Sequence, residues 1–315
     1  MKKIFTFIVL FIVLFMLSVL SFAQIDIPIT DGIVYYVSSA TGSDSKDGLT
    51  PQTALKTLQK GVDKCSGNTH DYVILLPSSA LYDDEILPSG TLSDGYTHRL
   101  ANCLIYINKP YVHIIGAQNK WGSNVVIKDG TSATAGTISF GAYADYCSIE
   151  NVSFSTTNSN AHITFAAGAD YNVIKGCVFI DGSHGIDADA GDCVRLHVTD
   201  CYFEEQSTYG VAMHSTGGVL SDCVFKDNTG DFNSAVYITG AAPSIVRRLY
   251  INGAGTSAVG ITVNNVNDVV IFDSYISKCD DNVSISGTNT VVNWVRIDAG
   301  GQGYAPAAVD SVFGQ

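Results

Sequence analysis

The sequence predicts an all-β fold, a single-stranded right-handed parallel β-helix (a solenoid) with a capping helix at its N-terminal end. Three observations lead to this fold class. A short β-rich motif recurs at intervals of 21 to 26 residues, and apolar residues keep the same places within each repeat. Glycine is frequent (30 residues) while charged residues are few (15%). Repeats of this length cannot bury a core alone and are typical of solenoids.

The first 23 residues (1–23) have the three parts of a secretory signal peptide. Lys2 and Lys3 form a basic region, an apolar run follows from Ile4 to Leu20, and a small-x-small cleavage site ends at Ala23. We therefore expect export to the extracellular space or the periplasm. An uncleaved anchor helix is the alternative, because the run is near membrane-spanning length. No other run is apolar and long enough, so no membrane span is expected in the mature chain.

The formal net charge of −13 restricts the partners. Nucleic acid is not expected, because its phosphates need a basic surface. A polyanionic substrate would need a local basic patch or a bridging cation.

Residues 24–70 are expected to hold an N-terminal strand and the capping helix. Thr53 can act as the helix N-cap, and an apolar stripe then runs from Ala54 to Val62. Such a helix would cover the open end of the solenoid, where the core is otherwise exposed.

Residues 71–315 are expected to form the β-helix, because seven stretches align on one apolar position. That position holds Phe154, Phe179, Phe203, Phe225, Ile251, Ile276 and Ile297. Apolar residues recur five positions earlier, and small, mostly apolar ones two positions earlier. These places share a face only if the chain bends between them, since strand side chains alternate. Residue types that tolerate the left-handed conformation of a sharp bend lie three positions earlier: Asn151, Gly176, Asp200, Asp222 and Asp273, with Arg248 and Trp294 as exceptions.

A second strand follows in each repeat, in the segments HITFA, GIDAD, GVAMH, AVYIT, AVGIT and NVSIS. Alternation predicts inward pairs such as Ile186 with Ala188, and Val259 with Ile261. One outward column is then expected to contain Asp187, Ala212, Tyr237 and Gly260. The column before it is also expected to face outward: His162, Gly185, Gly210, Ala235, Ala258 and Asn282.

Eight cysteines are compatible with disulfides in an exported protein. However, Cys177, Cys201 and Cys223 fall in one inward column of the repeat. We expect a ladder of buried thiols there, because cysteine is among the most buried residues. A disulfide within the column is the alternative.

The stretch Tyr35–Lys64 contains GSDSKDGLTPQTALKTLQ and precedes the coils. In this respect the chain resembles the pectate-lyase-like right-handed β-helix superfamily, whose secreted members often begin with a strand, a stretch of this kind and a helix. With the coils, the resemblance covers nearly all of the mature chain. It implies the fold and a substrate groove over the outward face of the strands that include GIDAD. It implies no single activity, because the superfamily holds lyases, hydrolases, epimerases, adhesins and phage appendage proteins.

Polar residues gather on this expected groove. Asp189 and His214 are expected in one column on adjacent coils, about 4.8 Å apart at the backbone. A carboxylate beside an imidazole orients it for general-base catalysis, so His214 is the candidate base and Tyr237 the candidate acid. Asp187 and Asp189 would orient His214. The candidate substrate-binding residues at the edge of this group are His162, His184 and Thr239.

Other interpretations of these residues stay open. Asp187, Asp189 and Asp192 offer hard oxygen ligands suited to Ca²⁺, the only cofactor that the sequence suggests. Alternatively, the polar residues are only the solvated face of a solenoid strand. Asp280 and Asp281 faintly resemble the paired aspartates of polygalacturonases. They lie four coils from Asp187, roughly 19 Å, which is too far for an acid–base pair.

These features predict a secreted protein that binds an extracellular polysaccharide and cleaves it as a lyase or glycoside hydrolase. None of Arg195, Arg247 and Arg248 falls in the groove columns, which does not fit the pectate-lyase mechanism. The alternative is a non-catalytic cell-surface, adhesin or appendage-type binding module. The chain after Ile297 is too short for an elaborate cap, so self-association through the C-terminal end is also expected.

Overall fold

The computed structural model describes residues 31–78, 81–82, 103–117, 125–128, 136–156, 160–227, 232–240, 244–253, 258–286, 290–293 and 295–298. The predicted signal peptide, 1–23, lies outside these residues, as does the chain after Asp298 on which the expected self-association depends. No helix in the part of the chain that the structure describes is long and apolar enough to cross a membrane.

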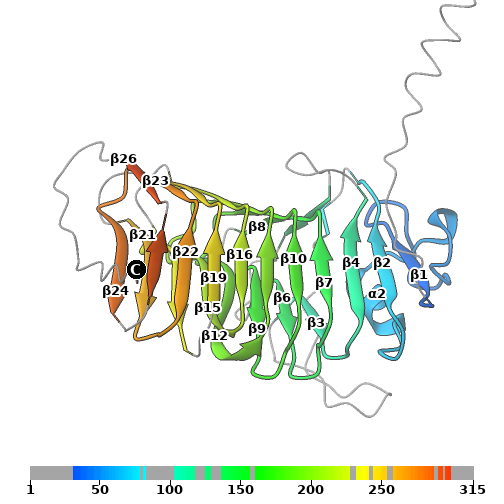
Figure 1. The fold of residues 1–315 in the computed structure, drawn as a ribbon. Coiled ribbons are helices and arrows are strands. Elements are labelled where there is room, and N and C mark those ends of the chain that lie inside the picture. The colour runs from blue at the N-terminus through cyan, green and yellow to red at the C-terminus, as the bar shows by residue number, and fades with distance from the viewer. Residues whose placement is uncertain are drawn as a thin grey trace, which may run out of the picture.

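Three parallel sheets form a right-handed β-helix, as predicted (Figure 1). We call them sheets A, B and C. From β7 onward the chain visits A, B and C in turn, so each coil adds one strand to every sheet. Every neighbouring pair of strands is parallel, so the backbone hydrogen bonds run along the axis of the solenoid from coil to coil.

Within the described residues, sheet A contains ten strands, named here in their spatial order. They are β1 (Val34–Val37), β2 (Asp71–Leu75), β4 (Val112–Gly116), β7 (Ser148–Glu150), β10 (Val173–Lys175), β13 (His197–Thr199), β16 (Val219–Ser221), β19 (Ser244–Arg247), β22 (Val269–Phe272) and β25 (Val291–Asn293).

Sheets B and C contain eight strands each in the part of the chain that the structure describes. In sheet B they are β5 (Val126–Lys128), β8 (Ser153–Ser155), β11 (Val178–Ile180), β14 (Tyr202–Glu204), β17 (Val224–Lys226), β20 (Tyr250–Asn252), β23 (Tyr275–Ser277) and β26 (Arg296–Asp298). In sheet C they are β3 (Ile105–Ile107), β6 (Ile138–Phe140), β9 (Ile163–Phe165), β12 (His184–Val194), β15 (Tyr209–Thr216), β18 (Ser234–Thr239), β21 (Val259–Asn264) and β24 (Asp281–Ser286).

A column of phenylalanines runs through the core. Phe154, Phe179, Phe203 and Phe225 are fully buried, and their rings stack almost in parallel at centroid separations of 5.0, 4.8 and 4.6 Å. Stacking at the spacing of the coils lets each ring bury its faces against its neighbours in the column. The inward positions of the repeat are therefore confirmed.

The bends between sheets A and B have the left-handed conformation that the repeat predicts. Asn151, Gly176, Asp200, Asp222 and Asp273 have φ between 52° and 63°.

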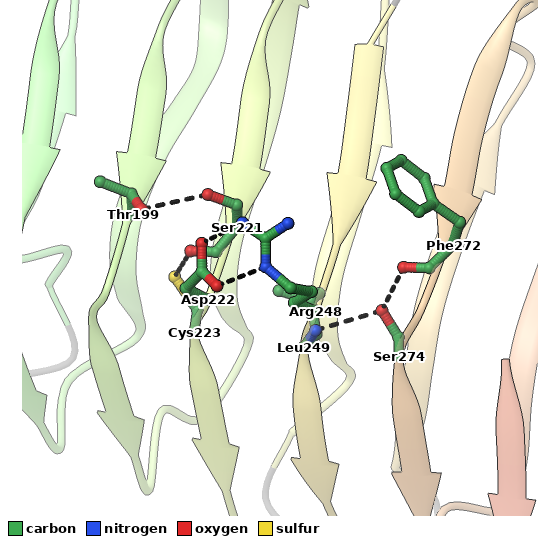
Figure 2. Close-up of polar contacts among 8 residues, drawn as sticks. All are labelled: Thr199, Ser221, Asp222, Cys223, Arg248, Leu249, Phe272 and Ser274. Atoms are coloured by element: carbon green, nitrogen blue, oxygen red, sulfur yellow. Dashed lines mark hydrogen bonds and ion pairs between the residues drawn. The ribbon is translucent and has the colours of Figure 1, made fainter. Parts of the chain in front are cut away.

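Arg248 is the exception by residue type, yet it takes the same conformation with φ 50°. Its guanidinium Nε and Nη2 donate to the two carboxylate oxygens of Asp222 at the neighbouring bend, at 2.6 and 2.7 Å. Figure 2 shows this pair bridging two coils, with the Thr199–Ser221 hydrogen bond beside it. The bidentate geometry stabilises a bend whose residue type is unfavourable there.

The capping helix is present, but it begins later than the sequence predicts. Helix α2 spans Leu58–Lys64, and its N-cap is Thr57, not Thr53. Residues 51–53 instead form the short 3₁₀ helix η1 (Pro51–Thr53), which Thr50 caps. Asp44 fixes Thr57 by accepting hydrogen bonds from its hydroxyl and its backbone N–H. Figure 1 shows α2 beside β1 and β2 at one end of the stack.

All eight cysteines are free thiols in the structure. Cys177, Cys201 and Cys223 are fully buried, and each Sγ donates to the backbone carbonyl oxygen two residues earlier, at 3.2 to 3.4 Å. The same carbonyl oxygens also accept backbone N–H groups from the preceding coil, so the thiols fill the core and add a second hydrogen bond at each bend.

Candidate functional site

The outer face of sheet C holds most of the residues that the sequence singled out. Its central column, from β9 to β24, is Thr164, Asp187, Ala212, Tyr237, Thr262 and Ser284. Asp187 and Tyr237 share this column, as predicted. Thr262, not Gly260, lies beside Tyr237, so the inward pair on β21 is Ile261 with Val263 and not Val259 with Ile261.

Asp189, His214 and Thr239 converge from three successive strands of this face. The Thr239 hydroxyl donates to Asp189 Oδ1 at 2.5 Å and lies 3.5 Å from His214 Nδ1. The register between β12 and β15 shifts after Ala188, so Asp189 leaves the regular column and its carboxylate reaches past β15 to β18. Such an irregularity re-aims a side chain that a straight strand would hold in line. The Thr239 hydroxyl therefore lies between Asp189 and His214 and contacts both side chains.

The absence of a side chain at Gly240 leaves room for the His214 imidazole. Gly240 follows β18 with φ +80°, and a Cβ built there would lie only 2.0 Å from His214 Cδ2. The ring thus lies against the Gly240 backbone. A side chain at this position would displace His214 from its present orientation.

Two tyrosines form the aromatic part of the site. Tyr209 and Tyr237 stack at 4.5 Å with an interplanar angle of 3°, and His184 meets Tyr209 edge-on at 5.2 Å. Asn264 Nδ2 donates to the Tyr237 hydroxyl at 2.7 Å. This bond leaves the phenol hydrogen able to point toward a ligand.

Burial sets the charge state at the edge of the site. It lowers the pKa of His184, and the nearby carboxylates of Asp187 and Asp189 offset this only in part. Burial likewise raises the pKa of Tyr209, and the nearby Tyr237 and Asp189 raise it further. At neutral pH, His184 and Tyr209 are therefore both uncharged, and the formal negative charge comes from the aspartates.

The expectation that His162 binds substrate is wrong, because its side chain is fully buried. Its Nε2 lies 3.1 and 3.0 Å from the carbonyl oxygens of Ile180 and Asp181, and its ring packs against Phe154 and Phe179. Gly185 and Gly210, in the same column, would also point inward, since a Cβ on either would lie 2.5 Å from a core phenylalanine ring. The column expected to face outward therefore faces the core.

The predicted calcium site includes a side chain that the structure does not describe. Among the described side chains, no group of three His, Cys, Asp or Glu residues converges on a point where a metal ion could sit. Asp192 belongs to β12, but its side chain lies outside the described part of the chain. Calcium at Asp187, Asp189 and Asp192 thus stays a prediction. Asp281 begins β24 and pairs with Val259, away from Asp187 in the sheet.

Sequence reasoning missed Tyr209 and Asn264. Tyr209 precedes GVAMH by one residue and pairs with His184, so aligning one residue earlier would have found it. Asn264 was missed because the sequence alignment placed β21 two residues out of register with its neighbours. Both lie beside the predicted residues, so the site is broader than the four candidate catalytic residues.

A second titratable cluster lies on the outer face of sheet A. His70 Nδ1 and His113 Nε2 are 2.9 Å apart, His113 Nδ1 is 3.0 Å from Ser148 Oγ, and Ser148 donates to Glu150 at 3.2 Å. Because the Ser148 hydrogen goes to Glu150, its oxygen accepts from His113 Nδ1–H, and His113 Nε2 accepts from His70. The hydrogen bonds therefore run in one direction, from His70 through His113 and Ser148 to Glu150. This arrangement requires a neutral His113.

No protein-family model matches this chain, and no curated protein sequence matches it. Solved structures do match. A rhamnogalacturonan lyase has a TM-score of 0.54 at 15% identity, over 83% of this chain and 73% of that chain. A GH136 lacto-N-biosidase from Eubacterium ramulus has a TM-score of 0.43 at 11% identity, over 84% and 68%. An exopolygalacturonase from Thermotoga maritima has a TM-score of 0.36 at 14% identity, over 71% of each chain.

Likeness at this level of identity shows the fold alone. The chain is a right-handed parallel β-helix protein, and the fold that its resemblance to the pectate-lyase-like superfamily implied is confirmed.

Proposed function

We propose that this protein is exported and binds a polysaccharide across β12, β15 and β18 on the outer face of sheet C. The observation that carries the proposal is the convergence of Asp189, Thr239 and His214 on that face. The stacked tyrosines lie on neighbouring strands and offer apolar surface and hydroxyl groups, both of which sugars use. The rhamnogalacturonan lyase that shares the fold acts, by its name, on a polysaccharide.

His214 is the base in this proposal. Thr239 donates its hydrogen to Asp189, so its oxygen can accept from His214 Nδ1–H, which leaves Nε2 as the basic nitrogen. The distance of 3.5 Å is long, and catalytic hydrogen bonds commonly tighten when substrate binds. Tyr237, whose hydroxyl oxygen accepts from Asn264, would protonate the leaving oxygen.

Asp187 and Asp189 offer a second chemistry. They lie two residues apart on one strand, about 6.6 Å at the backbone, and an inverting glycosidase uses a pair of carboxylates, one as acid and one as base. A lyase would depend on His214 and Tyr237, whereas a hydrolase would depend on these aspartates.

A depolymerisation assay tests the proposal. The mature chain would be incubated with acidic and neutral polysaccharides, and unsaturated ends and new reducing ends would be followed together. Unsaturated ends identify a lyase and reducing ends alone a hydrolase. If unsaturated ends form, His214→Ala should abolish them, while His197→Ala, which removes an exposed histidine of sheet A, should not. If only reducing ends form, Asp187→Asn/Asp189→Asn should abolish them. Full activity of His214→Ala would remove His214 from the mechanism.

The second candidate function is a non-catalytic binding module. It keeps the same face but requires no turnover. Polysaccharide binding that is lost in Tyr237→Ala, without any new chain ends, would establish it.

A further inference from the structure

The positions of the cationic side chains restrict the ligand of the proposed site. Between residue 129 and the C-terminus the sequence holds seven lysines and arginines: Lys175, Arg195, Lys226, Arg247, Arg248, Lys278 and Arg296. None of them belongs to a strand of sheet C. Lys175 and Arg247 are on sheet A, Lys226 and Arg296 are on sheet B, and the other three lie outside the strands.

Several of these cations already have partners away from the site. Lys226 pairs with Glu204 at 2.8 Å, and Arg248 pairs with Asp222 at 2.6 Å. The Arg195 guanidinium lies over the Tyr171 ring at 5.7 Å. Lys278 is exposed at the bend before β24, two strands beyond β18. In the described part of the chain, the central strands β12, β15 and β18 therefore carry no lysine or arginine that could pair with an anionic group.

The same strands carry negative charge. Asp187 and Asp189 lie on β12, and Thr239 donates to Asp189. Burial keeps His184 uncharged at neutral pH, so it does not balance them. A uronate or sulfate group placed here would meet like charge at short range, which is unfavourable by Coulomb's law even in a solvated setting.

We infer that the ligand of this face is a glycan without carboxylate or sulfate groups, either uncharged or bearing amino groups. This inference rests on the proposed function. Neutral hydroxyls can donate to Asp187 and Asp189, and an ammonium group gains a charge-assisted hydrogen bond to either carboxylate. Sugar oxygens can accept from Tyr237 and from the Asn264 amide.

The reaction follows from the ligand. β-Elimination requires a carboxylate next to the carbon that loses its proton, and such a glycan has none. Cleavage here is then hydrolysis: water bonds to one sugar, the glycosidic bond breaks, and the proton passes to the leaving oxygen. The products would carry reducing ends and no unsaturated ends.

Affinity electrophoresis with three probes tests the inference, using the mature protein at pH 7. The probes are chitosan oligosaccharides, a neutral galactan and polygalacturonate, the last with and without Ca²⁺. We expect retardation by the galactan or by chitosan and none by polygalacturonate. The double variant Asp187→Asn/Asp189→Asn should weaken the retained interaction about tenfold, since hydrogen bonds to charged groups are the strong ones.

A matched pair of substitutions controls for net charge. Asp268→Asn/Asp273→Asn removes two exposed aspartates at positions with positive φ, which asparagine tolerates, and neither lies in a strand of sheet C. This variant should bind as the wild type does. If it loses chitosan binding equally, that binding is a general charge effect and does not support the inference.

The outcomes separate the two proposals. Polygalacturonate binding that Tyr237→Ala abolishes, with or without Ca²⁺, would overturn the uncharged-ligand inference and leave the polysaccharide site in place. Binding of none of the three probes would count against the proposed function itself.

Discussion

At the residue scale, the Thr239 hydroxyl is the link between Asp189 and His214. We expect Thr239→Val, which keeps the shape and removes the hydroxyl, to lower activity or binding about tenfold, the loss expected for one hydrogen bond to a charged group. Thr239→Ser should restore most of it. The measurement is the pH profile of activity for the three proteins, or of binding if no turnover is found. A purely structural role would instead lower thermal stability and leave the profile unchanged.

The pKa of His113 makes stability depend on pH. Burial, with a smaller contribution from His70, lowers this pKa to about 4, against an unfolded value of about 6.5. The unfolded chain binds the proton more readily, so the stability from neutral His113 is full above about pH 6.5 and is lost as pH falls toward 4. The loss, when complete, is on the order of 3 kcal/mol.

Urea unfolding at pH 7.5 and pH 5 checks this expectation. His113→Gln should reduce the difference between the two pH values, whereas His197→Gln, at an exposed position, should reduce it much less. An unchanged pH dependence in His113→Gln would show that other groups control it.

Part of the site could be predicted residue by residue, and part could not. Asp187, Asp189, His214, Tyr237 and Thr239 lie on the expected face because strict alternation holds along the middle of each strand. His162 was misplaced because alternation fails at the start of these strands. Nothing in the residue type reveals that failure, since a histidine is accepted in a core and on a surface alike.

At the element scale, the starts of the sheet C strands place two consecutive residues inward. Gly210 and Val211 illustrate this: Val211 is fully buried, and a Cβ on Gly210 would lie 2.5 Å from the Phe225 ring. A small residue is therefore required beside Phe203 and Phe225, whereas His162 occupies the same column beside Phe154 and Phe179. The two-residue error in the register of β21 has the same origin, because the expected pattern assumed simple alternation.

We expect Gly210→Ala to destabilise the protein by about 1 to 3 kcal/mol through overpacking. The added methyl group must displace the Phe225 ring or the carbonyl of Ala235. Denaturant unfolding measures the change. The double variant Gly210→Ala/Phe225→Leu should be less destabilised than the sum of its two single variants. Strict additivity would mean that the two side chains do not clash.

At the scale of the whole molecule, the solenoid interior keeps the thiols unreactive. Seven cysteines are buried and Cys279 is half-buried. Burial raises the pKa of Cys147 to about 12 and that of Cys279 to about 11, so little thiolate is present near neutral pH.

A thiol reagent should therefore modify at most Cys279 in the native protein and all eight cysteines after denaturation. The apparent melting temperature should also be the same with and without reductant. Fewer than eight reactive thiols in the denatured, unreduced protein would reveal a disulfide and revive the alternative pairing within the column.

The global fold was predictable because it depends on averages over many coils, which tolerate local errors. Arg248 at a bend and the late start of α2 did not disturb it. The site depends on single contacts between neighbouring coils, and one register shift after Ala188 decides where Asp189 reaches. Such a shift does not change the pattern of apolar residues in the sequence, so the sequence does not reveal it.

The three-strand coil also has an evolutionary meaning. A duplication or loss of one coil within a gene would leave every core column continuous, so the solenoid would still fold. The same event between β12 and β18 would move Asp189 away from Thr239 and dismantle the site. In this architecture a single such mutation can therefore abolish the activity while the fold is kept. Related proteins that share the coils need not catalyse the same reaction.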